Sequence, residues 1–214
     1  MTLVVVASVI ARNSIELEKI LGKLKGHIKE IQLDFMDGLF VKTHSLDFDF
    51  ILPDDFNYEA HLMVVNPKKW LYALPEKIQK VIIHFELNEN VDEVINEARV
   101  LGKKVFIAIN PPTPIESIYP YLMKIDGVLI MSVEPGQYGA KFIPETLKKI
   151  NYIKKIRNNL LVEVDGGMNP ITAHQADLAG ADIITSGSFI INNENVLKAI
   201  NELERATSRS NDII

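Results

Sequence analysis

The chain has 214 residues, of which 47% are hydrophobic, and it carries a formal net charge of −5 with no cysteine. This length and hydrophobic content suit one domain with a full core. The acidic balance argues against a nucleic-acid partner, and the hydrophobic stretch 3–11 is too short to span a membrane. The absence of cysteine excludes disulfides and thiolate metal sites, so we expect a soluble cytoplasmic protein.

Short β-branched runs alternate with amphipathic stretches along the chain. In chain order, the expected strands are residues 3–8, 30–35, 58–64, 80–85, 104–110, 127–133, 160–164 and 182–185. Helical spacing of hydrophobic residues is clear at 17–24, 91–101 and 196–203. Asn13 and Ser14 can cap the first helix, and Pro144 can occupy the first turn of the sixth.

Strands that alternate with helices and are buried on both faces predict a parallel sheet with right-handed crossovers. Eight such repeats favour a single (β/α)₈ TIM barrel over an open doubly wound sheet. We expect residues 1–206 to form this catalytic domain and residues 207–214 to be a flexible tail. The chain has no glycine motif of the dinucleotide or nucleoside triphosphate type, so neither class of cofactor has support.

Two aspartates, Asp34 and Asp165, each end a hydrophobic stretch that reads as a strand. These are the second and seventh expected strands, whose carboxyl ends lie on opposite sides of a barrel mouth. Two carboxylates placed in this way can take a proton from one face of a substrate and return one to the other. The alternative is local: Asp34 or Asp37 caps the following turn, and Asp165 orders the glycines after it. The joint position of the pair favours catalysis.

His61 ends the third expected strand. Together with Asp34 and Asp165 it could bind a divalent metal through mixed nitrogen and oxygen ligands, which suits zinc, manganese, iron or cobalt. The alternative is a core histidine that is hydrogen-bonded to a carboxylate. Methionine lies at three of the expected strand ends, as Met36, Met63 and Met131. They either fill gaps in the core or form a hydrophobic wall that keeps water from a reactive enediolate.

Two glycine-bearing segments could hold a phosphate: residues 134–141, and Gly166-Gly167 together with residues 186–188. The loops after the last two strands of such barrels recurrently bind phosphate through backbone N–H groups. The alternative is ordinary turn chemistry, since glycine is needed wherever φ is positive.

Taken together, these segments resemble the ribulose-phosphate 3-epimerase family of ribulose-phosphate-binding barrels. The resemblance runs from about Ala7 to Phe189 and is carried by residues 7–10, 33–41, 61–67, 108–114, 131–136, 141–142 and 163–167. It implies an isomerase that interconverts D-ribulose 5-phosphate and D-xylulose 5-phosphate. It also implies a small phosphorylated ketose as substrate, one divalent metal ion and a homo-oligomer.

The resemblance also implies residue roles. Asp34 and Asp165 would be the acid/base residues and metal ligands, and His61 a third ligand that also meets the substrate. The remaining substrate contacts would be Ser8, Met36, Met63 and Met131, with Gly139, Gly166, Gly167, Gly187 and Ser188 at the phosphate. The loop 136–141 could close as a lid. A metal on the substrate oxygens would stabilise the charge that develops there.

The chain departs from the family pattern at three places. Gln32 stands where the family has a histidine metal ligand, and a glutamine oxygen is a poorer donor to zinc-like metals. Residues 42–44 replace the usual Pro-Asn, and His44 there could supply the missing nitrogen or simply face solvent. The lid, residues 136–140, has one glycine fewer than usual. Two alternatives therefore stay open: an epimerase of another ketose phosphate, such as allulose 6-phosphate, and a non-catalytic sugar-phosphate-binding paralogue.

Overall fold

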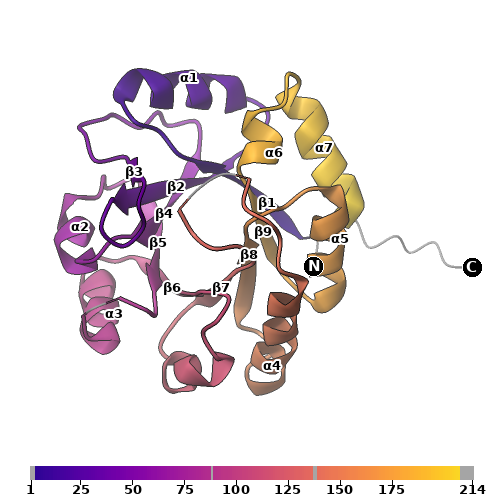
Figure 1. The fold of residues 1–214 in the computed structure, drawn as a ribbon. Helices are drawn as coiled ribbons and strands as arrows, with labels where there is room; N and C mark the ends of the chain where they lie inside the picture. The colour runs from indigo at the N-terminus through magenta and orange to yellow at the C-terminus, as the bar shows by residue number, and fades with distance from the viewer. Residues whose placement is uncertain (1–2, 88, 137–138, 208–214) are drawn as a thin grey trace, which may run out of the picture.

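Eight parallel strands close into a barrel in the part of the chain that the computed structural model describes, residues 3–87, 89–136 and 139–207. Around the ring these strands are β1 (Val4–Val9), β2 (Glu30–Asp37), β4 (Asn57–Met63), β5 (Ile78–His84), β6 (Lys104–Ile109), β7 (Gly127–Met131), β8 (Leu161–Asp165) and β9 (Ile183–Ser186). Because β1 pairs with both β2 and β9, the ring is closed (Figure 1). The expected strands and the expected TIM barrel are confirmed.

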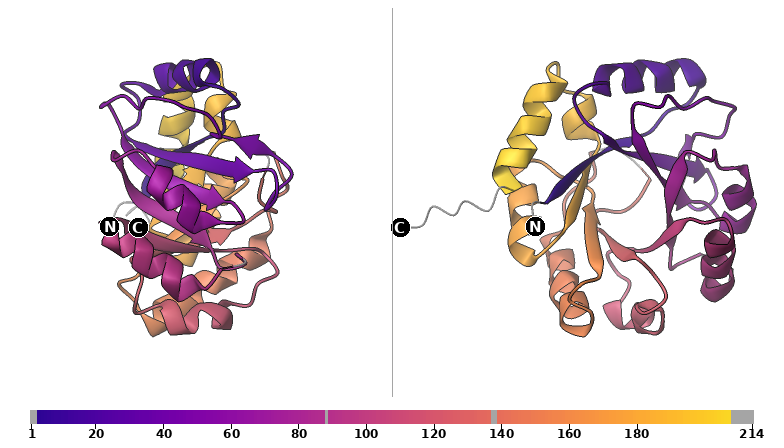
Figure 2. Two further views of the ribbon diagram at one scale, coloured as in Figure 1. Left: turned by 90° about the vertical axis from the view of Figure 1, so that its left-hand side faces the viewer. Right: turned by 180° about the vertical axis from the view of Figure 1, so that it is seen from behind.

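Helices surround the barrel on its outside (Figures 1 and 2). They are α1 (Ser14–Leu24), α2 (Pro67–Ala73), α3 (Val91–Val100), α4 (Lys148–Ile156), α5 (Pro170–Ala179), α6 (Ser188–Ile191) and α7 (Val196–Thr207). The helices expected at 17–24, 91–101 and 196–203 are thus confirmed as α1, α3 and α7. Asn13 caps α1, because its side chain accepts a hydrogen bond from the Glu16 N–H, and Pro144 opens a 3₁₀ turn that runs directly into α4.

Two of the crossovers differ from a regular β/α repeat. Residues 38–56, between β2 and β4, contain no helix; they contain only the short strand β3 (His44–Ser45), antiparallel to β2. This connection still covers the barrel, since it buries Leu46 and Leu52 in the main core. Between β6 and β7 the chain forms a 3₁₀ helix, Ile115–Tyr121, which contains Pro120. A proline inside an α-helix would remove a hydrogen bond and clash with the preceding turn.

The hydrophobic core has two separate parts. The larger part lies between the outer faces of the strands and the surrounding helices and loops. The smaller part lies inside the barrel and consists of Val6, Ile82, Phe106, Ala108, Leu129, Met131, Val133 and Ile183. Side chains alternate along each strand, so every second residue faces the barrel interior. This alternation determines which strand residues reach the mouth.

Charged side chains also occupy the barrel interior. Lys80 makes ion pairs with Glu59 and with Glu163, the latter at 3.0 Å, and Thr185 donates to Glu163 at 2.5 Å. Glu59 precedes His61 by two residues on β4, and Glu163 precedes Asp165 by two on β8. The cluster therefore lies one layer below those residues, toward the amino ends of the strands.

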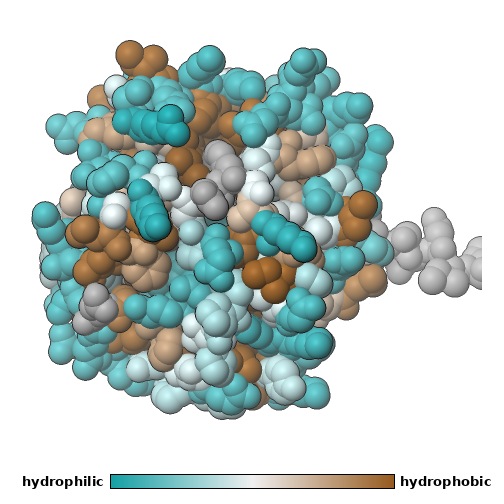
Figure 3. Space-filling model, in the orientation of Figure 1, coloured by the Kyte–Doolittle hydropathy of each residue, from teal (hydrophilic) through white to brown (hydrophobic). Residues whose placement is uncertain are grey.

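The outer surface is mostly polar on the face drawn in Figure 3, where hydrophobic residues form small groups among hydrophilic ones. None of the helices in the described residues has the length and hydrophobicity needed to cross a membrane. The expected tail, residues 207–214, lies outside the described residues except for Thr207, which is the buried last residue of α7.

Candidate active site

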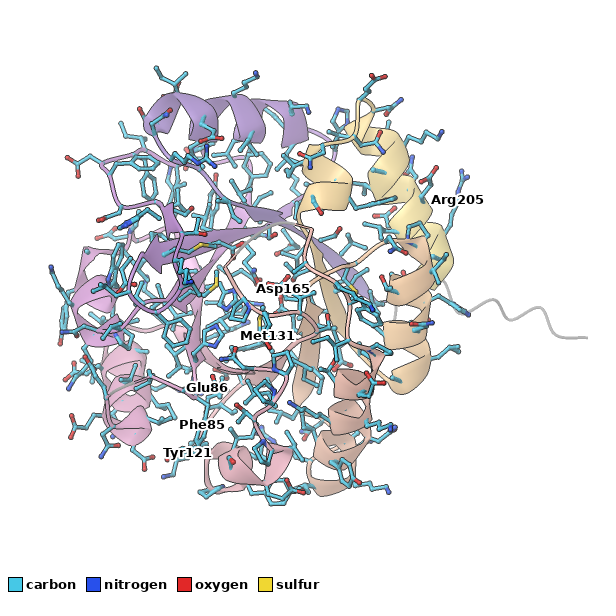
Figure 4. The ribbon with its side chains drawn as sticks, in the orientation of Figure 1. Phe85, Glu86, Tyr121, Met131, Asp165 and Arg205 are labelled. Carbon is cyan, nitrogen blue, oxygen red and sulfur yellow. The ribbon has the colours of Figure 1, made fainter. Side chains whose placement is uncertain are left out.

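A cavity lies at the carboxyl ends of the barrel strands and brings the expected site residues together. Those that line it are Ser8, Asp34, Met36, His61, Met63, Met131, Gly139, Asp165, Gly166, Gly167, Gly187 and Ser188. Figure 4 shows Asp165 and Met131 near the axis of the ring, whereas Arg205 lies on its outside. Gln32 is the one expected residue that does not line the cavity; it is completely buried beneath it.

Asp34 and Asp165 meet at His61. Nδ1 of His61 lies 3.3 Å from Oδ1 of Asp34 and 3.6 Å from Oδ2 of Asp165. The ligand atoms of the three side chains all lie within 4.8 Å of one another, and within the described residues no other group of histidine and acidic side chains is arranged in this way. Asp34 is aligned with His61 across β2 and β4, so the sheet register itself places these two side by side.

The turn after β2 is capped by Asp37 rather than by Asp34. Oδ1 of Asp37 accepts from the N–H groups of Leu39 and Phe40, and its Oδ2 accepts from Val65. Burial alone would raise the pKa of Asp37, but these backbone hydrogen bonds outweigh it and lower that pKa. Asp34 is therefore not needed for the turn and points into the cavity.

Gln32 reaches the centre of the cluster from below. Its Nε2 donates to Oδ1 of Asp34 and to Oδ2 of Asp165, each at 2.8 Å, and lies 3.3 Å from Nδ1 of His61. Its Oε1 is buried and has no hydrogen-bond partner. Leaving a buried acceptor unpaired costs about 1–3 kcal/mol. The amide therefore joins the two carboxylates, but its oxygen is left unsatisfied.

These four side chains fit a divalent metal ion. Gln32 Nε2 lies 2.8 Å from an oxygen of either aspartate, and His61 Nδ1 lies 3.3 Å from Asp34 and 3.6 Å from Asp165. Ligand atoms that lie about 2.0–2.2 Å from one ion have comparable mutual distances. A half-turn of the Gln32 amide would exchange Nε2 and Oε1, so the unpaired oxygen would become a fourth donor. The donor set would then be three oxygens and one nitrogen.

The protonation of the cluster is shifted by burial and by mutual charge. Burial raises the pKa of Asp34 to about 6, with a further rise from Asp165, although the hydrogen bond and charge of His61 oppose this. Burial would lower the pKa of His61, but hydrogen bonds and charge from Asp165 and Asp34 raise it to about 9. In the absence of metal, His61 is therefore protonated near neutral pH, while Asp34 titrates just below that pH.

His84 and Glu86 also belong to the site, although the sequence pattern assigned no role to them. Nε2 of His84 lies 2.9 Å from Nε2 of His61, and the two ring planes are at 15° to each other with centroids 5.0 Å apart. Nδ1 of His84 lies 3.3 Å from Oε2 of Glu86. Burial lowers the pKa of His84 to about 4, so this ring is neutral. The position of His84 at a strand end is the only sequence signal for it.

Three methionines, Met36, Met63 and Met131, line the cavity and are almost fully buried. They come from β2, β4 and β7, and so surround the carboxylates from different sides of the barrel. Their side chains therefore form hydrophobic parts of the cavity lining. Ser8, at the end of β1, adds a hydroxyl to the same cavity.

The loops after β7, β8 and β9 contribute glycine backbone to the cavity. Gly166 and Gly167 have φ values of 112° and 64°, and a Cβ on Gly166 would lie 2.4 Å from Val133. Only glycine fits this close approach without strain. The described residues that line the cavity include no Lys or Arg, so an anion there would be held by backbone N–H groups.

Parts of the two altered loops can be placed. His44 is exposed on β3 and its ring packs against Gly38, outside the group of metal-ligating side chains. Gly136 packs against Val41, which brings the expected lid into contact with the connection after β2. Gln137 and Tyr138, within the expected lid, lie outside the described residues.

Comparison with known proteins gives matches over most of the chain. The profile of the Ribulose-phosphate 3 epimerase family matches residues 4–191. A ribulose-phosphate 3-epimerase from Schizosaccharomyces pombe is 30% identical over 214 residues, covering 96% of this chain and 94% of that protein. A ribulose-phosphate 3-epimerase from Mycobacterium bovis is 34% identical over 184 residues, covering 82% of this chain and 80% of that protein. One from Methanocaldococcus jannaschii is 33% identical, covering 86% of each chain.

Solved structures share the fold at much lower identity. A 3-hexulose-6-phosphate synthase from Salmonella typhimurium superposes with a TM-score of 0.70 at 12% identity, covering 96% of this chain and 98% of that one. An orotidine 5'-monophosphate decarboxylase from Sulfolobus solfataricus superposes with a TM-score of 0.64 at 14% identity, covering 96% of this chain and 97% of that one. These likenesses support the barrel alone.

Proposed function

Because this chain belongs to the ribulose-phosphate 3-epimerase family, we propose that it interconverts D-ribulose 5-phosphate and D-xylulose 5-phosphate. The chain is an epimerase, in the isomerase class, and the family implies a phosphorylated sugar as substrate. The observation that carries the specific proposal is the convergence of Asp34, Asp165 and His61 at one cavity. On this proposal one domain, residues 1–206, contains the whole site.

The two aspartates act as acid and base. One takes the proton from the carbon next to the ketone, which leaves a planar enediolate, and the other returns a proton to the opposite face. The pKa of Asp34, raised by burial to about 6, supports this role, because an acid/base group works best near the operating pH. The carbon is inverted and no redox cofactor is required.

Asp34, His61 and Asp165, with Gln32 through its amide oxygen, would hold one divalent metal ion, which we propose to be zinc, manganese, iron or cobalt. When bound, the ion supplies positive charge that stabilises the negative charge of the enediolate. Without the ion, the Gln32 amide keeps the two carboxylates together from below through its N–H groups.

The rest of the cavity would bind the substrate. Met36, Met63 and Met131 exclude water from the enediolate, and Ser8 and His61 contact the sugar. The phosphate would lie against the backbone of Gly139, Gly166, Gly167, Gly187 and Ser188. The loop 136–141 would close over it, and the contact of Gly136 with Val41 supports this position.

Family resemblance also suggests a cytoplasmic homo-oligomer of carbohydrate metabolism, in the pentose phosphate pathway. The net charge of −5 supports the absence of a nucleic-acid partner. Gln32 and the altered loops favour one alternative, an epimerase of another ketose phosphate such as allulose 6-phosphate. The other alternative, a non-catalytic paralogue, is disfavoured by the converging acid/base pair.

One experiment tests the proposal. D-ribulose 5-phosphate and allulose 6-phosphate are incubated separately with the protein in D₂O, and the products are followed by NMR. We expect xylulose 5-phosphate with deuterium at the inverted carbon, and slower turnover of the hexulose. Faster turnover of allulose 6-phosphate would assign the alternative substrate. Calorimetric binding of both sugars without turnover of either would show a paralogue that binds but does not react.

A further inference from the structure

A row of hydrogen bonds runs from the metal-ligating cluster to the loop after β6. Oε1 of Glu86 accepts from the backbone N–H of Asn110 at 2.8 Å and from the hydroxyl of Thr113. Burial alone would raise the pKa of Glu86, but hydrogen bonds from His84, Thr113 and Asn110 outweigh it and lower that pKa. Glu86 is therefore an ionised carboxylate, and both of its oxygens accept.

This carboxylate determines where the proton lies on His84. Oε2 of Glu86 can only accept, so Nδ1 of His84, at 3.3 Å, must carry the hydrogen. Nε2 of His61 lies 2.9 Å from Nε2 of His84, so one of these two nitrogens donates a hydrogen bond and the other accepts it. Because the hydrogen of His84 is on Nδ1, His84 accepts at Nε2 and His61 donates. The other nitrogen of His61, Nδ1, is then the one available to a metal.

We propose that Glu86 and His84 are positioning residues that orient His61 and select its Nε2–H tautomer, so that Nδ1 is presented to the metal. The inference rests on the proposed metal site. Ligating histidines generally donate their second N–H to such a partner, and loss of that partner weakens metal binding by about 10–100-fold. Here the partner is itself a histidine, whose own proton is determined by Glu86.

Neighbouring residues hold His84 and Glu86 in place. The Phe40 ring lies against His84, with centroids 4.7 Å apart. Nζ of Lys149 donates to the carbonyls of Asn110 and Pro111 at 2.9 and 3.0 Å, which anchors the loop that binds Glu86. In Figure 4, Glu86 lies farther from the barrel axis than Asp165 and Met131. The two positioning residues thus act from behind His61 and do not line the cavity.

Glu86→Gln tests the inference, because it changes the hydrogen-bond pattern with little change in shape. The backbone N–H of Asn110 still requires an acceptor, so the new amide must turn its oxygen there and its NH₂ toward His84. Nδ1 of His84 must then accept, its proton moves to Nε2, and His61 loses its acceptor. We expect Zn²⁺ affinity, measured by competition with a chelating dye, to fall about 10–100-fold.

The direct readout is the NMR spectrum of the ¹⁵N-labelled histidine rings. We expect His84 to be protonated at Nδ1 in the wild type and at Nε2 in Glu86→Gln. Glu86→Asp keeps a carboxylate and should retain the wild-type tautomer. Glu93→Gln, at a mostly exposed position on α3, is the matched control and should change neither the tautomer nor the Zn²⁺ affinity.

A wild-type His84 protonated at Nε2 would overturn the inference, as would a Glu86→Gln protein with unchanged Zn²⁺ affinity. If Glu86→Gln fails to fold, the wild-type spectrum alone tests the inference, because it shows which nitrogen of His84 carries the hydrogen. That spectrum is recorded on Zn²⁺-free protein, so it does not depend on the proposed reaction. Absence of epimerase activity with the expected tautomer would count against the proposed function and leave the tautomer assignment supported.

Discussion

The amide nitrogen of Gln32 lies 2.8 Å from Oδ2 of Asp165, so a hydrogen bond joins two residues 133 positions apart in the sequence. The same nitrogen donates to Asp34, which uses both hydrogens of the amide. Gln32 thus holds the proposed acid and base at a common centre without contributing a charge. Its oxygen has no hydrogen-bond partner, and on the proposed metal site a half-turn of the amide would direct that oxygen to the ion.

The first prediction concerns Gln32→His. We expect this protein to bind Zn²⁺ or Co²⁺ at least about tenfold more tightly, because an imidazole nitrogen suits these metals better than an amide oxygen. Competition with a chelating dye measures the affinity. The control is Gln79→His, at an exposed position on β5, which should leave the affinity unchanged. Equal affinities for Gln32→His and the wild type would show that position 32 does not take part in metal binding.

The second prediction concerns the acid/base pair. Asp34→Asn and Asp165→Asn should each lower the epimerase rate by at least about 10²–10⁴-fold, because either change removes one of the two proton-transfer groups. Neither variant should incorporate solvent deuterium at the carbon that the wild type inverts. Asp92→Asn, on the exposed side of α3, serves as the control, and circular dichroism checks that each variant is folded. Near-normal deuterium exchange in either variant would rule out the two-aspartate mechanism.

The third prediction concerns the pH dependence of the metal-free protein. Hydrogen bonds to Asp165 and Asp34 raise the pKa of His61 from 6.5 to about 9, against the effect of burial. Between these values the folded state binds a proton that the unfolded chain has lost. The resulting stabilisation, roughly 3 kcal/mol, is full below pH 6.5 and is lost as the pH rises through 9.

Burial raises the pKa of Asp34 from 3.8 to about 6. The stability of the metal-free protein should therefore also fall as the pH rises from 3.8 through 6. Urea unfolding of chelator-treated protein at a series of pH values measures both effects, and His61→Asn should remove the loss between pH 6.5 and 9. In contrast, Zn²⁺ binding should strengthen over that range, because the metal displaces the proton. A metal-free protein that becomes more stable from pH 6.5 to 9 would contradict the charged state of His61.

The fourth prediction concerns the charged cluster inside the barrel. Nζ of Lys80 lies 3.0 Å from Glu163, pairs with Glu59 and sits 4.3 Å from the centre of the Phe106 ring. Lys80→Met should lower the free energy of unfolding by about 3–5 kcal/mol, because it leaves buried carboxylates without their cation. Urea denaturation measures the loss.

The double variant Lys80→Met with Glu163→Gln should recover part of this stability, since it also removes a buried carboxylate. Lys198→Met is the surface control: Lys198 forms a long, exposed pair with Glu202, at 3.9 Å, and little change is expected. Equal stability of Lys80→Met and the surface control would show that the buried pairs make no net contribution.

The fifth prediction concerns Gly166. Gly166→Ala should destabilise the protein by about 1–3 kcal/mol and weaken phosphate binding, because φ is 112° and the new methyl group would lie 2.4 Å from Val133. Gly22→Ala is the matched control within α1, where nothing lies within 4 Å of the added Cβ. It should stabilise the protein by about 0.5–1 kcal/mol. Thermal unfolding and calorimetry with inorganic phosphate measure the two effects.

Much of the barrel could be predicted from the sequence because its signals are local. The hydrophobic runs that form β2 and β8 end at Asp34 and Asp165, and parallel strands of a closed barrel end at one mouth. The segment 38–56 was less predictable. It lacks a helical period, and its packing depends on where Leu46 and Leu52 meet the outside of the barrel.

The contact from His84 to Glu86 could not be predicted in the same way. A histidine at a strand end faces either the barrel or the helices, and its ring nitrogens find partners only after neighbouring strands are in register. The pairing of β4 with β5 brings His61 and His84 together, and the loop after β6 then holds Glu86. These contacts join residues of β4 and β5 with the loops that follow β5 and β6.

The amino-acid order alone was enough to indicate the barrel, the meeting of Asp34, His61 and Asp165, and the unusual glutamine at position 32, because each depends on strand spacing or residue type. Folding in three dimensions settled the rest: the Gln32 amide lies at the centre of the cluster, and His61 directs Nδ1 toward it. The reason is geometric. Distances of about 3 Å between side chains depend on the register of β2, β4 and β8 and on rotamers within a closed interior, and no periodicity along the chain encodes them.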